Sequence, residues 1–237
     1  MADGRSIVLD NVKLRLGAKQ FHFDCVLPGG RIIAVTGPSG AGKSTFLNLL
    51  AGFETADSGR IRLDGIDVTG LHPAERPVSL VFQDNNLFAH LDLFTNIALG
   101  VDPAMRLTAQ DSDRISQALA RVGLAGYERR MPGTLSGGER QRAAFARTLV
   151  RRRPVLLLDE PFAALDPGLR SGMADLLLAL HKETANSVVI VSHDPAEVHR
   201  LADHAVFVEE GQVRLAAPLA DYLACESLPA LRHFLGH

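Results

Sequence analysis

Short runs of mostly apolar residues alternate along the chain with longer segments in which apolar and polar side chains follow a helical period. The runs lie at 32–35, 78–82, 155–158 and 187–191, and each is typical of a strand buried on both faces. The segments expected to be helical lie at about 46–50, 107–123, 139–152 and 168–184. This alternation predicts an α/β fold with a mostly parallel sheet and crossover helices.

A second pattern, in which apolar and polar residues alternate, predicts antiparallel strands outside that core. The strands expected there are 6–16, 21–27, 60–65, 205–209 and 213–216, the last two forming a hairpin that turns at Glu210 and Gly211. The period of two is clearest in Phe21-His22-Phe23-Asp24-Cys25. From about 84 to 132 the pattern changes to helices and loops, with Thr108 as the expected N-cap of one helix. That stretch is the candidate inserted lobe.

Composition narrows the function classes. The chain has 237 residues, 46% of them hydrophobic, which suits one α/β domain with an inserted lobe. A formal net charge of −2 gives no basic field and argues against a nucleic-acid partner. Cys25 and Cys225 lack metal or redox spacing, so a reduced, cytosolic protein is the simplest interpretation. No apolar run approaches the roughly 18 residues of a membrane-spanning helix, so a membrane role requires a partner.

The candidate chemistry begins where the strand at 32–35 ends. Residues 37–44 fit the phosphate-loop pattern G-x-x-x-x-G-K-[ST] between a strand and a helix. Glycines let the backbone approach an anion closely, and the helix that follows directs its positive end at the same phosphates. Lys43 can reach the β- and γ-phosphates, and the Ser44 hydroxyl can bind Mg²⁺. The expected phosphate contacts are Gly37, Pro38, Ser39, Gly40, Ala41, Gly42, Lys43, Ser44 and Thr45.

Polar residues follow three of the apolar runs. Asp159 and Glu160 end the run at 155–158, where Asp159 can hold Mg²⁺ and Glu160 can orient or deprotonate the attacking water. Gln83 can bind Mg²⁺ or contact the same water, and His193 can reach the γ-phosphate. The alternatives are a helix-capping acidic pair, a solvated glutamine and a structural histidine.

A second helix end with the character of an anion site lies at 135–139. Ser136, Gly137 and Gly138 open the helix that follows. One nucleotide does not need two such ends from one chain, so we expect this end to face the nucleotide of a second copy. Two identical chains would then bury two ATP molecules with twofold symmetry.

Taken together, these motifs resemble the ATP-binding subunits of ABC transporters over nearly the whole chain. Residues 37–44 match the Walker A loop, 156–160 the Walker B strand with its catalytic glutamate, and 135–139 the signature. Gln83 matches the Q-loop, 164–166 the D-loop and His193 the switch histidine.

The resemblance implies a P-loop NTPase with a mostly parallel core, an N-terminal antiparallel part and an inserted helical subdomain. The single ABC ATPase domain would divide into a RecA-like core at about 1–83 and 133–237 and the helical subdomain at about 84–132. It also implies hydrolysis of ATP with Mg²⁺ by a homodimer on the cytoplasmic face of the inner membrane. The implied partners are transmembrane permease subunits and, indirectly, a periplasmic solute-binding protein.

Within the family, residues 76–88 are similar to the ATP-binding subunits of importers for small solutes. The part at 85–88, with His90, Leu91, Asn96 and Ile97, is most similar to the subunits of thiamine importers. Import of thiamine and its phosphates is therefore the expected function, with iron, polyamine or another small solute as alternatives. More distant alternatives are a non-transport ATPase of the DNA-repair or ribosome-associated kind and a binding module without catalysis. Repair members carry long coiled coils and ribosome-associated members two ATPase units, neither of which the sequence contains.

Two positions depart from the family pattern. The signature ends in Glu139 where glutamine is usual, which adds a charge that could alter closure of the dimer. Leu16 stands where an aromatic residue usually stacks on adenine. Either Leu16 makes an apolar contact with the base, or Phe21 or Phe23 replaces the missing ring.

Overall fold

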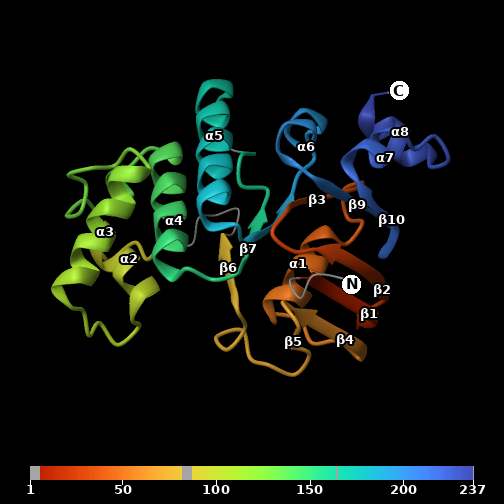
Figure 1. Cartoon of the computed structure of the whole chain (residues 1–237), viewed down its shortest axis with the longest axis horizontal. Helices are drawn as coiled ribbons and strands as arrows, with labels where there is room; N and C mark the ends of the chain where they lie inside the picture. The colour runs from red at the N-terminus through yellow and green to blue at the C-terminus, as the bar shows by residue number, and fades with distance from the viewer. Residues whose placement is uncertain (1–5, 82–86, 164, 237) are drawn as a thin grey trace.

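A computed structural model describes residues 6–81, 87–163 and 165–236. In this part of the chain, ten strands form one sheet in the order β5-β4-β1-β2-β10-β9-β3-β8-β7-β6 (Figure 1). The strands are β1 (Ser6–Leu16), β2 (Lys19–Pro28), β3 (Ile32–Thr36), β4 (Ser58–Leu63), β5 (Ile66–Asp67), β6 (Val78–Val81), β7 (Val155–Asp159), β8 (Ser187–Val191), β9 (His204–Glu209) and β10 (Gln212–Pro218). The helices are α1 (Lys43–Ala51), α2 (Leu93–Val101), α3 (Ala109–Arg121), the 3₁₀ turn η1 (Pro132–Thr134), α4 (Gly137–Arg151), α5 (Pro167–Thr184), α6 (Pro195–Leu201), α7 (Leu219–Leu223) and α8 (Pro229–Leu235).

The parallel half of the sheet confirms the strands expected from the apolar runs. β6, β7, β8, β3 and β9 pair in parallel, with Leu156 opposite Val188 and Ala34 opposite Ile190. Side chains of β3 alternate between two buried clusters: Ala34 packs on the side of α4 and α5, and Val35 on the side of α1. A strand with apolar layers on both faces must be apolar throughout, which explains why these runs do not alternate.

The antiparallel half confirms the second pattern. β1 pairs with β2 and β4, and β9 pairs with β10, all antiparallel. Phe21 and Phe23 on β2 point into the core, whereas Asp24 between Phe23 and Cys25 is exposed. The period of two therefore indicates a sheet with one face against the core and the other toward solvent.

The stretch between β6 and β7 is helical, as expected. Thr108 caps α3 through a reciprocal pair of contacts with Asp111, which confirms the predicted N-cap. The fully buried Asn96 side chain donates to the carbonyl oxygens of Leu91 and Asp92, at 2.9 and 3.0 Å, and so closes the turn before α2. In Figure 1, α2, α3 and α4 gather at one end of the molecule, away from α1.

The short elements are the ones the sequence pattern does not predict. β5 has two residues, α6 and α8 have seven and α7 has five, all too short for a period to be recognised. Burial of Tyr222 and Leu231 holds α7 and α8 against the core. None of the described helices is both long and apolar enough to cross a bilayer.

Candidate nucleotide site

The loop between β3 and α1 has a backbone that only glycine fits at two points. Gly37 has φ of 140°, and a Cβ there would lie 2.0 Å from the carbonyl oxygen of Val208. Gly42 has φ of 109°, and a Cβ there would lie 2.8 Å from the Phe21 ring. Both positions combine a left-handed backbone with close packing, so the glycine spacing is required by the shape of the loop. Pro38, Ser39 and Gly40, at the tip between them, are exposed to solvent.

Lys43 is the first residue of α1, and its side chain folds back over the loop. Its Nζ donates to the carbonyl oxygens of Gly37 and Pro38, each at 2.9 Å, and the residue is only 8% exposed. Burial lowers the pKa of Lys43, while the nearby carboxylates of Glu160 and Asp159 oppose that shift. The ammonium group is thus held inside the loop, where an anion would restore its lost solvation.

The end of β7 brings oxygen ligands to the same place. The Ser44 hydroxyl hydrogen-bonds the Asp159 carboxylate. Burial raises the pKa of Asp159; the Ser44 hydrogen bond and the charge of Lys43 oppose the rise, and Glu160 adds to it. Within the described residues, no group of three or more His, Cys, Asp or Glu side chains could hold a metal ion by itself. A hydroxyl and a half-buried carboxylate fit a hard cation that takes its other ligands from phosphate and water.

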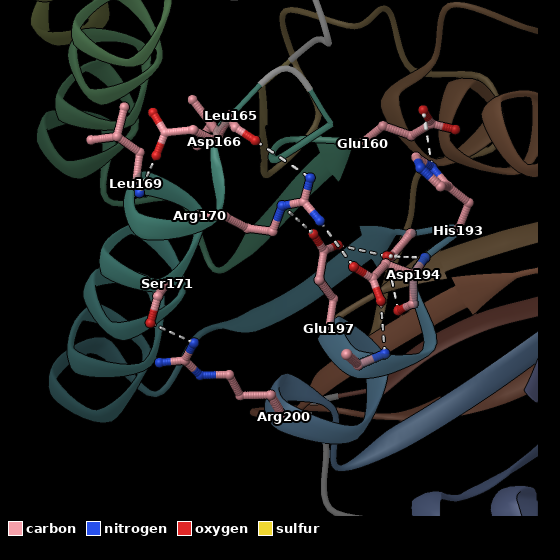
Figure 2. A network of polar contacts seen from close by, with 12 residues as sticks. Glu160, Leu165, Asp166, Leu169, Arg170, Ser171, His193, Asp194, Glu197 and Arg200 are labelled. Atoms are coloured by element: carbon pink, nitrogen blue, oxygen red, sulfur yellow. Dashed lines mark hydrogen bonds and ion pairs between the residues drawn. The ribbon is translucent and has the colours of Figure 1, made fainter.

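Glu160 follows Asp159 in a strained conformation and faces His193. Its φ is 45°, which is uncommon for a residue with a side chain, and its amide donates to the Val191 carbonyl at 3.2 Å. The Oε2 of Glu160 lies 3.5 Å from Nδ1 of His193, as Figure 2 shows. The two side chains are 27% and 61% exposed. β7 and β8 therefore bring together a carboxylate and an imidazole that the sequence separates by 33 positions.

The signature segment lies on a different part of the molecule. Ser136 is the N-cap of α4: its hydroxyl accepts from the Glu139 amide at 3.2 Å, and the Glu139 carboxylate accepts from the Ser136 amide at 2.7 Å. A glutamine oxygen could accept the same bond, so Glu139 differs from the usual residue mainly in charge. The hydrogen bond from the Ser136 amide, and to a lesser degree the one from the Ser136 hydroxyl, lower the pKa of Glu139, which stays ionised at neutral pH. Figure 1 places α4, which begins directly after Ser136, away from α1.

The residues considered for the adenine contact have different surroundings. Phe23 is fully buried in an edge-to-face contact with Phe46, and Phe21 packs beneath Gly42. Neither phenylalanine presents a ring face to solvent, whereas Leu16 is 37% exposed. An apolar contact from Leu16 is therefore the option that the burial pattern favours. Gln83 lies outside the described residues.

An ionic network next to this site did not follow from the sequence motifs. Arg170 on α5 donates to the Asp194 carboxylate at 3.0 Å and to the Leu165 carbonyl at 3.4 Å (Figure 2). Its Nε lies 3.7 Å from the carboxylate of Glu197, which in turn accepts from the Ser192 hydroxyl at 2.6 Å. Burial raises the pKa of Glu197, and the charges of Arg170 and His193 oppose that rise. The Arg170 guanidinium thus connects Leu165, before α5, to the two neighbours of His193. It contacts Asp194 directly and Ser192 through Glu197.

We expect Arg170→Ala to reduce ATP turnover about tenfold, because His193 would lose its fixed position relative to Glu160. The matched control is Arg200→Ala: Arg200 also joins α6 to α5, through Ser171 and Asp175, but within the described residues it makes no polar contact with a neighbour of His193. Steady-state ATPase assays and thermal melts of both variants separate positioning from stability. Equal turnover in the two variants, at equal melting temperature, would contradict a positioning role for Arg170.

A strand, a glycine loop that encloses a lysine, and a carboxylate at the end of another strand of the same parallel sheet define a P-loop nucleotide-binding protein. The family model described as "ABC transporter" matches residues 21–163, more than half of the chain. The chain belongs to the ABC transporter family and is one of its ATP-binding cassettes, with the fold of a P-loop ATPase.

Curated relatives match over nearly their whole length. The chain is 50% identical over 236 residues to the "Thiamine import ATP-binding protein ThiQ" of Brucella suis biovar 1 (strain 1330), covering 100% of this chain and 98% of the relative. It is 47% identical over 232 residues to the protein of the same name in Rhizobium meliloti (strain 1021), covering 98% of each.

A similar solved structure is the "Dimeric structure of a post-hydrolysis state of the ATP-binding cassette MJ0796 bound to ADP and Pi". Its TM-score is 0.78 at 28% identity, and the match covers 90% of this chain and 98% of that one. A second dimeric structure of that cassette gives a TM-score of 0.79 at the same identity. The expected fold class is thereby confirmed.

Proposed function

We propose that this chain is the ATP-binding and ATP-hydrolysing subunit of an importer for thiamine and its phosphates. The observation that supports the substrate is the 47% to 50% identity, along nearly the whole chain, to proteins named for thiamine import. The subunit need not touch the solute, so the solute rests on this likeness alone. Iron and polyamine import remain outcomes of the test below.

The site residues have separate proposed roles in hydrolysis. Residues 37–45 hold the phosphates through backbone amides, and Lys43 neutralises the β- and γ-phosphates. Ser44, Asp159 and Gln83 would hold Mg²⁺, which would supply positive charge beside the phosphates when bound. Glu160 orients the attacking water and accepts its proton, and His193 contacts the transferred phosphoryl group.

The proposed working form is a homodimer in which each nucleotide lies between two chains. Ser136, Gly137 and Gly138 of one chain would close over the γ-phosphate held by the loop of the other. The separation of α4 from α1 supports this arrangement, and so does the dimeric form of the matched cassette in both solved structures. Leu16 would contact the adenine.

The remaining proposed partners are the other subunits that an importer requires. The helical segment at about 84–132, set apart from a core at about 1–83 and 133–237, would receive the permease subunits. The chain would sit peripherally on the cytoplasmic face of the inner membrane, and a periplasmic solute-binding protein would act through the permease.

The test is ATP turnover in vesicles that contain this chain and the permease that co-purifies with it. We expect thiamine with its periplasmic binding protein to stimulate turnover several-fold, because solute arrival and dimer closure are coupled through the permease. Ferric iron and spermidine serve as control solutes with the same vesicles. Stimulation by either control, and none by thiamine, would contradict the proposed substrate.

A further inference from the structure

A second cavity lies at the edge of the sheet opposite the nucleotide site. It has a volume of about 570 Å³ and is lined by α3, the end of α4, the end of α5 and the first residues of β6, β7 and β8. The phosphate loop and Glu160 follow the carboxyl ends of β3 and β7, whereas Ser79, Leu156 and Ser187 lie near the amino ends of their strands. The cavity is therefore separate from the site described above, and its size suits a small organic ligand.

The lining carries more positive than negative charge. The two acidic residues in the lining are Asp64 and Glu183. The four basic ones are Arg114, Arg121, Arg152 and Arg153. Arg114 pairs with Asp111, which is not among the lining residues, and Arg121 pairs with Glu183. Neither Arg152 nor Arg153 makes an ion pair within the described parts of the chain, so two guanidinium groups beside the cavity lack an acidic partner.

Two buried polar atoms in the lining are also without partners. Ser79 is 3% exposed, and its hydroxyl oxygen makes no hydrogen bond within the described residues. The same holds for Nδ1 of His181 on α5, an atom that is itself buried. A buried polar group without a partner costs free energy, so a hydrogen bond from a bound ligand or from water would be favourable for both groups.

The rest of the wall is mixed. Apolar side chains, among them Ala118, Leu149, Leu156, Leu177 and Leu180, lie beside the polar Gln117, Thr148, Thr184 and Asn186. A ligand with an apolar body and an anionic group fits this lining, and the forked arginine donors match the oxygens of a phosphate. We propose that this cavity binds a small organic phosphate with an aromatic or aliphatic body, whose phosphate is held by Arg153, Arg152 and the Ser79 hydroxyl.

The position of the cavity suggests what binding does. α3 belongs to the helical segment between β6 and β7, and α5 follows β7 in the core; the Arg121–Glu183 pair already connects them across the lining. A ligand held from both sides resists movement of α3 and α4 relative to α5. Because the proposed function requires the Ser136 end of α4 to close over ATP, occupancy should lower ATP turnover. This last step rests on the proposed function; the binding itself does not.

Isothermal titration of the isolated chain, saturated with Mg-ADP, tests the binding. We expect phenyl phosphate to bind about tenfold more tightly than inorganic phosphate, benzyl alcohol or phenylacetate. Ser79→Ala and Arg153→Ala should each weaken phenyl phosphate about tenfold. Arg106→Ala is the matched control, because Arg106 is an exposed arginine that pairs with Asp102 and lies outside the lining.

Unchanged affinity in both Ser79→Ala and Arg153→Ala, or equal weakening in Arg106→Ala, would overturn the site. Phenylacetate binding as tightly as phenyl phosphate would overturn the ligand class. In the permease vesicles, binding without any fall in turnover would overturn the regulatory role alone. Failure of thiamine to stimulate those vesicles would leave the titration result intact, so the two proposals fail separately.

Discussion

Glu160→Gln should reduce ATP turnover by about 10²- to 10³-fold and leave ATP bound between two chains. The substitution keeps the size and the position of the side chain but removes the group that accepts a proton from water. Asp159, Ser44 and Lys43 are unchanged, so nucleotide binding should persist. Phosphate release measures the turnover, and size-exclusion chromatography with Mg-ATP measures dimer formation.

A suitable control is Glu210→Gln. Glu210 also has a positive φ, 49°, but its side chain is 81% exposed and pairs with Arg214. Backbone strain is therefore matched in the two variants, and only Glu160 faces His193. Normal turnover in Glu160→Gln would remove Glu160 from its proposed role, and an equal loss in Glu210→Gln would show that the effect is not specific to the carboxylate facing His193.

The sequence predicts the shape of the phosphate loop because that loop is built from consecutive residues. A loop that encloses Lys43 needs glycine where a Cβ would meet Val208 or Phe21, and these requirements leave a fixed spacing in the chain. The carboxylate at the end of β7 is predictable for a similar reason, since an apolar run that stops at Asp159 marks the edge of a parallel sheet.

The residues that support the site leave no such local mark. Arg170 meets Asp194 across 24 positions, and α6, which carries Glu197, is too short to show a helical period. Asp194 followed by Pro195 does fit a helix start, and that signal could have indicated α6. The cavity at the opposite edge combines five segments, so only the folded chain reveals Ser79 and His181 beside its arginines.

The structure also shows where the rings of Phe21 and Phe23 lie, which the sequence left open. Alternation in β2 gave Phe21 and Phe23 the same face, but it could not say whether that face met a nucleotide or the core. Both rings pack inside, with Phe23 against Phe46, and Leu16 is the exposed residue. Burial of a ring depends on α1 packing over β2, which is a tertiary contact.

The central claim is that each ATP lies between the loop of one chain and the Ser136 helix end of the other, and mixed dimers on the permease test it. The test uses two substitutions. Lys43→Ala removes the cation of the loop, and Ser136→Asp keeps a good N-cap but repels phosphate. All chains carry Glu160→Gln, so that bound ATP is retained and can be counted.

When Lys43→Ala is in one chain and Ser136→Asp in the other, both changes should fall in a single site, and one ATP should be retained per dimer. When both changes are in one chain beside an otherwise unchanged partner, each site carries one change, and almost no ATP should be retained. The reverse result, with ATP retained only in the second arrangement, would show that each chain completes its own site and would contradict the account.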